Sequence, residues 1–127
     1  MSSELRALCN EKKVKADVVA TNDTNPNFPD SYAFRVQLHY KRRQLTTPFF
    51  VGYGWTREPD AADVLGSLLS DAATVRCADS FETWCNELGY DPDSRRAYAT
   101  WTQCVAGEKK LARFLGDDYQ DFMEVEH

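Results

Sequence analysis

Residues 80–116 restrict the fold more than any other part of this 127-residue chain, because apolar side chains recur at helical spacing on both sides of a turn. Phe81, Trp84, Cys85 and Leu88 fall at positions i, i+3, i+4 and i+7, which predicts a short helix with one apolar face. Gly89 stands where a helix commonly ends with a left-handed residue. The pattern therefore predicts a helix, a tight turn and a longer helix.

The longer helix is predicted to begin at Asp91 or Asp93, whose carboxylates can accept hydrogen bonds from unpaired backbone N–H groups. Pro92 is tolerated in a first helical turn, and Gly116 is expected to end the helix. Its inward stripe consists of mostly apolar residues at helical spacing: Ala97, Tyr98, Trp101, Cys104, Val105, Leu111, Ala112 and Leu115. We expect this helical pair to act chiefly as a scaffold.

The clearest strand covers residues 31–41, where the side chains alternate between two faces. Tyr32, Phe34, Val36, Leu38 and Tyr40 share one face, and Ala33, Arg35, Gln37 and His39 share the other. Weaker alternation predicts strands over residues 13–21 and 44–51, and Pro48 favours an edge position or a bulge for the latter. A basic turn of Lys41, Arg42 and Arg43 joins an antiparallel hairpin, and residues 22–30, rich in Asn, Asp and Pro, are predicted to be a loop.

The remaining patterns are helical. Asp60 can cap a helix whose stripe is Ala61, Val64, Leu65, Leu68, Leu69 and Ala72, and Tyr119, Phe122 and Met123 keep helical spacing in an acidic tail. Residues 1–11 give only a weak helical signal. We therefore expect one α+β domain over residues 1–127. A three-stranded antiparallel sheet (residues 12–54) is expected to be covered on one face by three to four helices (residues 60–125).

Charge is divided along the chain. The net charge is −5, but residues 1–57 hold nine Lys/Arg and five Asp/Glu, whereas residues 58–127 hold six and fifteen. An acidic end repels nucleic acid and attracts a basic protein groove of the kind that normally holds nucleic acid. The acidic end thus favours a protein partner.

Other features exclude several classes of protein. No apolar run is long enough to span a bilayer, and the first residues lack the apolar core of a signal peptide, so we expect a cytoplasmic protein. The four cysteines show no paired spacing, which argues against a zinc or redox motif. The sequence around Gly52 and Gly54 has no phosphate-binding loop motif. Tyr53 and Trp55 could form a binding surface, but aromatic residues at a strand–helix junction belong more often to the core. We expect no cofactor or metal.

No catalytic constellation is evident. His39 and His127 are the only imidazoles, and His39 lies on the predicted outer face of its strand without a motif partner. The acidic tail does not have the spacing of a calcium loop. A helix-turn-helix interpretation would use Arg95 and Arg96, but carboxylates crowd the same end of the helix. We therefore expect a protein that is not an enzyme.

Two surfaces remain as binding candidates. The first is acidic and consists of Asp117, Asp118, Asp121 and Glu124, followed by Glu82 and Glu87. The second is the basic hairpin of Arg35, Lys41, Arg42 and Arg43, a nucleic-acid candidate whose more ordinary interpretation is an edge hairpin kept soluble by charge. A solvated acidic face is likewise the ordinary interpretation of the first.

Four segments carry a resemblance: RRQLTTPFFVGYG, PDAADVLGSLLSDA, SFETWCNELGYDPDSRRA and KKLARFLGDDY, in this order over roughly the last two thirds of the chain. With them the chain resembles a family of small proteins encoded by phages, prophages and related mobile elements, most of which carry no assigned activity. The resemblance implies a strand hairpin packed against helices, and it implies no catalytic residues. Small acidic phage proteins of this kind are often inhibitors of host defence, including anti-CRISPR proteins.

These observations lead to one hypothesis and one alternative. The hypothesis is a non-enzymatic phage or mobile-element protein that inhibits a host CRISPR-type defence complex by stoichiometric protein–protein binding in the bacterial cytoplasm. The alternative is an accessory phage protein that binds nucleic acid through the basic hairpin. The two differ in their expected dependence on salt, because nucleic-acid binding weakens steeply as salt rises.

Overall fold

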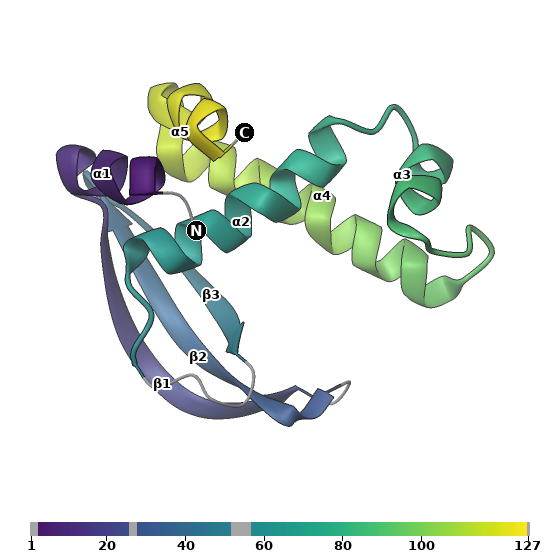
Figure 1. Ribbon diagram of the computed structural model, residues 1–127, viewed down its shortest axis with the longest axis horizontal. Helices are drawn as coiled ribbons and strands as arrows, with labels where there is room; N and C mark the ends of the chain where they lie inside the picture. Colours follow the sequence, from purple (N-terminus) through teal and green to yellow (C-terminus); the bar gives the residue numbers. More distant parts are fainter. Residues whose placement is uncertain (1–2, 26–27, 52–56, 127) are drawn as a thin grey trace. The chain divides into compact units, whose positions relative to one another are not determined.

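The computed structural model describes residues 3–25, 28–51 and 57–126, which contain a three-stranded antiparallel sheet and five α-helices (Figure 1). The elements in chain order are α1 (Ser3–Lys12), β1 (Lys15–Asn25), β2 (Phe28–Tyr40), β3 (Arg43–Val51), α2 (Ala61–Arg76), α3 (Phe81–Leu88), α4 (Arg95–Leu115), a 3-10 turn η1 (Gly116–Asp118) and α5 (Tyr119–Glu126). Apart from α1, the strands precede the helices. The predicted α+β class is confirmed.

The chain divides into two compact units, Met1–Ser67 and Leu68–His127, with the boundary inside α2. The first unit holds α1, the whole sheet and the start of α2. The second holds the end of α2, together with α3, α4, η1 and α5. Two expectations stay predictions: helices cover one face of the sheet, and the chain forms one domain.

In the first unit, β2 is the central strand, with β1 and β3 on its two edges. The alternation predicted for β2 is confirmed from residue 34 onward: Phe34, Val36, Leu38 and Tyr40 are buried, whereas Arg35 is exposed. Pro48 lies opposite Arg35 in the edge strand β3, which accepts a residue that lacks an N–H. Burial of one face fixes the register of this hairpin, because a shift of one residue would move the apolar side chains to the other face.

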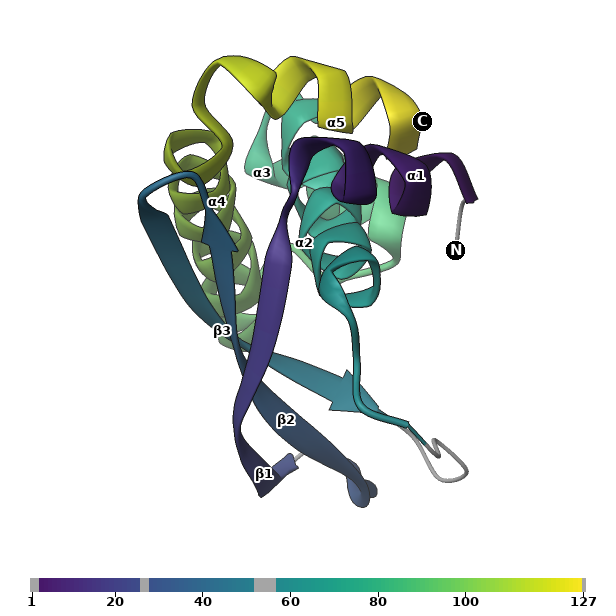
Figure 2. The same ribbon diagram turned by 90° about the vertical axis from the view of Figure 1, so that its left-hand side faces the viewer.

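Helix α1 runs directly into β1 (Figure 2). Lys13 takes the left-handed conformation with φ of 61°, and the Val14 N–H donates to the Cys9 carbonyl at 3.0 Å, which closes the end of the helix. The strand therefore begins at Lys15 rather than at residue 13 as predicted. The weak helical signal of residues 1–11 corresponds to a ten-residue helix that buries Leu5 and Cys9.

The predicted loop over residues 22–30 is wrong. β1 continues to Asn25 and β2 starts at Phe28, so most of this polar segment extends the hairpin. The pairing of β1 with β2 shifts register after Val18, after Ala20 and after Thr24. Bulges of this kind let a segment of low strand propensity remain in a ladder, because pairing with the neighbouring strand outweighs local preference.

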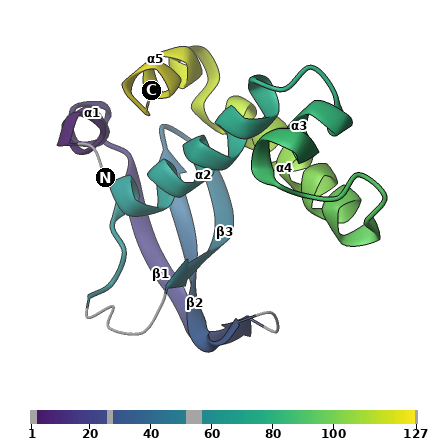
Figure 3. The same cartoon turned by 45° about the vertical axis from the view of Figure 1, so that its right-hand side comes forward.

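In the second unit, α3 lies beside the N-terminal part of α4, and α5 lies at the other end of α4 (Figure 3). Both predicted glycine stops are confirmed: Gly89 ends α3 with φ of 77°, and Gly116 ends α4 with φ of 59°. The predicted start of α4 is wrong, because Ser94 is its N-cap. Asp91 instead accepts the Asp93 N–H at 2.9 Å within the turn.

The predicted inward stripe of α4 is partly wrong. Ala97, Leu111 and Leu115 are buried, but Tyr98 is 57% exposed. In α3, Leu88 was also expected inside and is 45% exposed. Phe114 was not placed on the stripe and is buried. Helical spacing defines a face, but the neighbours that pack against that face decide how wide the buried part is.

Candidate interaction surfaces

Exposed apolar side chains gather where α3 meets α4. Among the described residues, five large hydrophobic side chains are strongly exposed, and three of them, Leu88, Tyr90 and Tyr98, fall within eleven residues of sequence. The half-buried Phe81 and Trp101 are in ring contact with Tyr98. We call these five residues the α3–α4 surface.

Ring contacts link the four aromatic residues of the α3–α4 surface, Tyr90 through the buried Trp84. The Phe81 ring lies 5.4 Å from the Tyr98 ring in an edge-to-face arrangement and 5.3 Å from the Trp101 ring, measured between centroids. On its other side Phe81 stacks on Trp84, which is buried and in turn stacks on Tyr90 at 5.1 Å. The exposed tyrosines therefore rest on a packed core rather than projecting alone.

Local capping fixes the position of both helices. The Ser80 hydroxyl accepts the Thr83 N–H at 3.2 Å, and the Ser94 hydroxyl accepts the Ala97 N–H at 3.3 Å. The Trp84 indole N–H donates to the Thr74 hydroxyl at 3.2 Å, which ties α3 to the end of α2. These bonds make the α3–α4 surface a preformed one.

Carboxylates lie around this surface. Glu82 and Glu87 on α3 are exposed, and so are Asp91 and Asp93 in the turn, with Arg95 and Arg96 following at the start of α4. Burial raises the pKa of the Cys85 thiol, and the charges of Asp91 and Glu82 raise it further. The carboxylates of Asp91 and Glu82 therefore both lie close enough to Cys85 to affect its thiol.

The structure divides the predicted acidic residues into two groups. Asp117, Asp118, Asp121 and Glu124 lie in η1 and α5, whereas Glu82 and Glu87 lie on α3, near the opposite end of α4 (Figure 3). Asp117, Asp121 and Glu124 are exposed, and Asp118 is half-buried. The second unit as a whole carries six Lys/Arg and twelve Asp/Glu. The acidic residues therefore share a unit but do not form one continuous group.

Helix α5 is anchored by its apolar side and by Tyr119. Phe122 and Met123 are buried, the Tyr119 hydroxyl donates to Glu108 Oε1 at 3.0 Å, and the Arg76 guanidinium lies over the Tyr119 ring at 5.3 Å. Burial and the bond to Glu108 raise the pKa of Tyr119 to about 12, although Arg76 acts in the opposite direction. The carboxylates of Asp121 and Glu124 on α5 are exposed. In the described part of α5, no large apolar side chain is strongly exposed beside them.

The predicted nucleic-acid residues lie in the hairpin of β2 and β3. Lys41 and Arg42 are exposed at its tip, and Arg35 is exposed on the outer face of β2. The Lys41 ammonium lies 5.3 Å, and the Arg43 guanidinium 5.6 Å, from the centre of the Tyr40 ring. Arg43 is half-buried, and its Nε has no hydrogen-bond partner in the described structure, so it presents less charge to solvent than Lys41 and Arg42.

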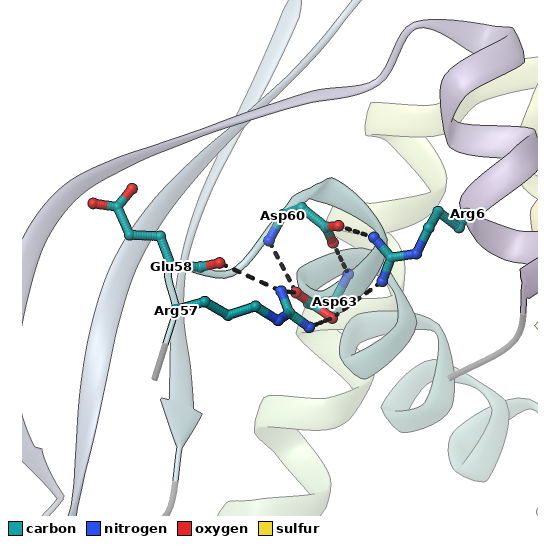
Figure 4. Close-up of polar contacts among 5 residues, drawn as sticks. All are labelled: Arg6, Arg57, Glu58, Asp60 and Asp63. Atoms are coloured by element: carbon teal, nitrogen blue, oxygen red, sulfur yellow. Dashed lines mark hydrogen bonds and ion pairs between the residues drawn. The ribbon is translucent and has the colours of Figure 1, made fainter. Parts of the chain in front are cut away.

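An ion cluster at the N-terminus of α2 was not predicted (Figure 4). Asp63 is 3% exposed, and the Arg57 guanidinium donates to its two oxygens at 2.5 and 3.0 Å. The Asp63 N–H donates to Asp60 Oδ1 at 2.9 Å, and the Asp60 N–H donates back to Asp63 Oδ2 at 3.0 Å. Asp60 therefore caps the helix as expected, and the second carboxylate completes a reciprocal cap.

Arg6 of α1 joins the same cluster. It pairs with Asp60, and its Nη2 lies 3.7 Å from Asp63 Oδ1. The bond to Asp63 raises the pKa of Arg57. Asp60 and Asp63 stand three residues apart before an apolar run, and this spacing is a sequence signal for a helix cap. No sequence motif indicates that Arg6 and Arg57 pair with these two aspartates. The cluster links α1, residue 57 and α2, and we interpret it as structural.

A cavity of about 390 Å³ lies beside this cluster, with Arg6, Asn10, Lys15, Asp17 and Asp60 contributing polar groups to its lining. The Cys9 thiol also lines it, and burial raises the pKa of this thiol to about 11, with Arg6 opposing the shift. A thiol of this kind is protonated at neutral pH and is a poor nucleophile. Because charges of both signs line the cavity, it indicates no particular ligand.

The single histidine of the described sheet lies close to a carboxylate that sequence spacing did not reveal. His39 Nε2 lies 3.0 Å from Asp17 Oδ2, because β1 and β2 pair Lys15 with His39 and Asp17 with Gln37. Asp17 is largely exposed. Within residues 3–25, 28–51 and 57–126, no group of three or more His, Cys, Asp and Glu side chains could hold a metal ion. Tyr53, Trp55 and His127 lie outside the described residues.

None of the helices described by the structure combines the length and apolar character that crossing a membrane requires. In comparisons with known proteins, no family model, curated protein or solved structure matches this chain.

Proposed function

We propose that this protein is a non-enzymatic inhibitor that binds a host nucleic-acid-guided defence complex, of the anti-CRISPR type, as a stoichiometric protein partner. The observation that carries the proposal is the charge of the second unit, whose twelve Asp/Glu outnumber six Lys/Arg. Five of the six predicted acidic contact residues are exposed, and the sixth is half-buried. A surface of this sign complements the basic groove in which such a complex holds nucleic acid.

The setting of the proposal comes from the resemblance to phage and mobile-element proteins. A protein of that origin would meet the defence complex in the cytoplasm of the bacterial host. Charge complementarity of this kind mainly raises the association rate and suppresses binding to acidic partners. We therefore expect inhibition to weaken as salt rises, without the steep dependence of direct nucleic-acid binding.

The test is an inhibition assay with purified CRISPR effector complexes of several types, each loaded with guide RNA. Target-DNA cleavage or binding is measured as the protein is titrated, and inhibition should saturate near one protein per complex. Reversing the charge of the two acidic groups together should weaken inhibition. If no complex is inhibited at any ratio, the proposed function is wrong.

The basic hairpin supports a second candidate, an accessory protein that binds nucleic acid. The specific observation is that Lys41 and Arg42 are exposed at one tip, with Arg35 exposed on the same strand pair. Gel-shift titrations with single- and double-stranded DNA and RNA at low salt would detect such binding. Lys41→Glu with Arg42→Glu should reduce both the affinity and the salt slope, and no binding at low salt would eliminate this candidate.

A further inference from the structure

We infer that the α3–α4 surface is where this protein binds its partner, and that the partner presents an amphipathic basic helix. The inference rests on the proposed function, because it specifies the site and chemistry of that protein–protein contact. The helix would place apolar side chains on Tyr98 and Tyr90 and direct Lys or Arg toward the surrounding carboxylates.

Exposure singles out this surface. Tyr98 is 57%, Leu88 45% and Tyr90 41% exposed, in a unit whose other large described hydrophobic side chains are buried or half-buried. Aromatic side chains in a cluster of this kind dominate the binding energy of protein interfaces. An apolar centre framed by polar groups is the usual anatomy of such an interface.

Rigidity strengthens the case. The exposed rings rest on Phe81 and Trp84, and Trp84 is fixed by its bond to Thr74 and its stack on Tyr90. Three caps, at Ser80, Gly89 and Ser94, fix the ends of the two helices. A preformed aromatic surface loses little conformational entropy on binding, which favours affinity.

Charge decides the chemistry of the partner. Glu82, Glu87, Asp91 and Asp93 are exposed around the surface, against Arg95 and Arg96, so the rim is acidic on balance. Lys and Arg side chains of a partner can pair with these carboxylates and also lie over the faces of exposed tyrosine rings. An amphipathic basic helix supplies both the apolar stripe and the flanking cations.

The second acidic group fits this role less well. Asp117, Asp121 and Glu124 lie on the solvent side of η1 and α5, whose large apolar residues Phe122 and Met123 are buried. Exposed charges without an apolar centre contribute little affinity. The structure thus separates two groups that the sequence had joined, and it favours the one on α3.

The experiment uses the full chain and a defined probe, a fluorescein-labelled helical peptide of about 18 residues with a Leu stripe flanked by Lys and Arg, and no Trp. Binding is measured by fluorescence anisotropy. Tyr98→Ser should weaken binding at least about tenfold. Phe50→Ser, which removes an aromatic side chain of similar exposure (52%) from β3, should change it less than about twofold.

A second pair of variants tests the charge. Glu82→Lys with Glu87→Lys should weaken binding at least about tenfold, whereas Asp117→Lys with Asp121→Lys makes the same change in net charge and should have a much smaller effect. Circular dichroism of each variant confirms that it is folded. Equal effects of the two pairs would show that only overall charge matters, and would overturn the inference.

Three other results would also overturn the inference. The first two are no binding of the peptide, and a loss of peptide affinity in Phe50→Ser equal to that in Tyr98→Ser. The third is a dimer in sedimentation that Tyr98→Ser dissociates, because the occupant of the surface would then be a second copy of the chain. The inference and the proposed function fail separately. Peptide binding at the α3–α4 surface without inhibition of any defence complex refutes the proposed function. Inhibition that survives Tyr98→Ser and the α3 charge reversal refutes the site.

Discussion

The rings of Trp84 and Tyr90 are stacked, with an interplanar angle of 3° and a centroid separation of 5.1 Å. Trp84 belongs to α3, and Tyr90 is the first residue after Gly89. Gly89 is the left-handed C-cap that ends α3 and reverses the chain direction. The Tyr90 N–H completes this turn by donating to the Cys85 carbonyl at 2.9 Å. One left-handed glycine therefore places an exposed tyrosine over a buried tryptophan.

Gly89→Ala should destabilise the protein by about 1 kcal/mol. Nothing lies within 4 Å of a Cβ added at this position, so the loss comes from the left-handed backbone, with φ of 77°, and not from a clash. Gly107→Ala is the matched comparison, because it also meets no atom within 4 Å but lies inside α4. It should stabilise by about 0.5–1 kcal/mol. Urea unfolding measures both, and destabilisation by both changes would contradict the assignment to backbone conformation.

Asp63→Asn should lower the free energy of unfolding by about 1–2 kcal/mol. The change removes the buried charge that faces Arg57 and Arg6, but both guanidinium side chains are about half exposed, so water reduces the loss. The midpoint of urea unfolding should fall with little change in slope. Glu11→Gln, an exposed change in α1, is the control and should stay within about 0.5 kcal/mol.

The four thiols should differ in reactivity. Cys77 is exposed, whereas Cys9 and Cys85 are buried, and burial raises the pKa of both buried thiols, to about 11 for Cys9. At pH 8, a disulfide reagent such as Ellman's should react rapidly with one thiol per chain, and Cys77→Ser should abolish this fast phase. Cys104 is intermediate in exposure with a raised pKa, and should react slowly. Fast reaction of Cys9 in the folded protein would contradict its burial.

Tyr119 should couple stability to alkaline pH. Burial and the bond to Glu108 raise its pKa to about 12 from the ordinary value of 10.0. The folded state therefore holds the phenol proton more tightly than the unfolded state, so this stabilisation is complete below about pH 10 and is lost between about pH 10 and pH 12. Unfolding should be compared between the native chain and Tyr119→Phe from pH 9 upward. The native chain should lose stability more steeply, and parallel curves would exclude the coupling.

Much of the fold follows from short-range patterns. The spacing of Phe81, Trp84 and Cys85 predicts α3 and two of its buried residues, and Gly89 and Gly116 end their helices as expected. Residues 34–40 alternate between buried and more exposed positions in agreement with prediction. These features were predictable because each depends on residues within a few positions of one another.

The candidate sites were less predictable. Spacing placed Tyr98 on the inward stripe, yet it is exposed, because α3 covers only part of that face through Phe81. The acidic residues were grouped by charge, but Glu82 lies on α3 and Asp117 in η1, near opposite ends of α4. His39 and Asp17 meet only through the register of two strands.

The sequence by itself determined the helices of residues 81–88 and 95–115 to within a few residues, the central hairpin and its buried face, and the acidic character of the second unit. Periodicity and turn residues act locally, so they can be read along the chain. Only the tertiary structure decided that Arg57 and Arg6 meet Asp63, and that Tyr90 and Tyr98 stay exposed over one aromatic core. The reason is physical: burial and pairing depend on which distant elements come into contact, and no local pattern specifies that.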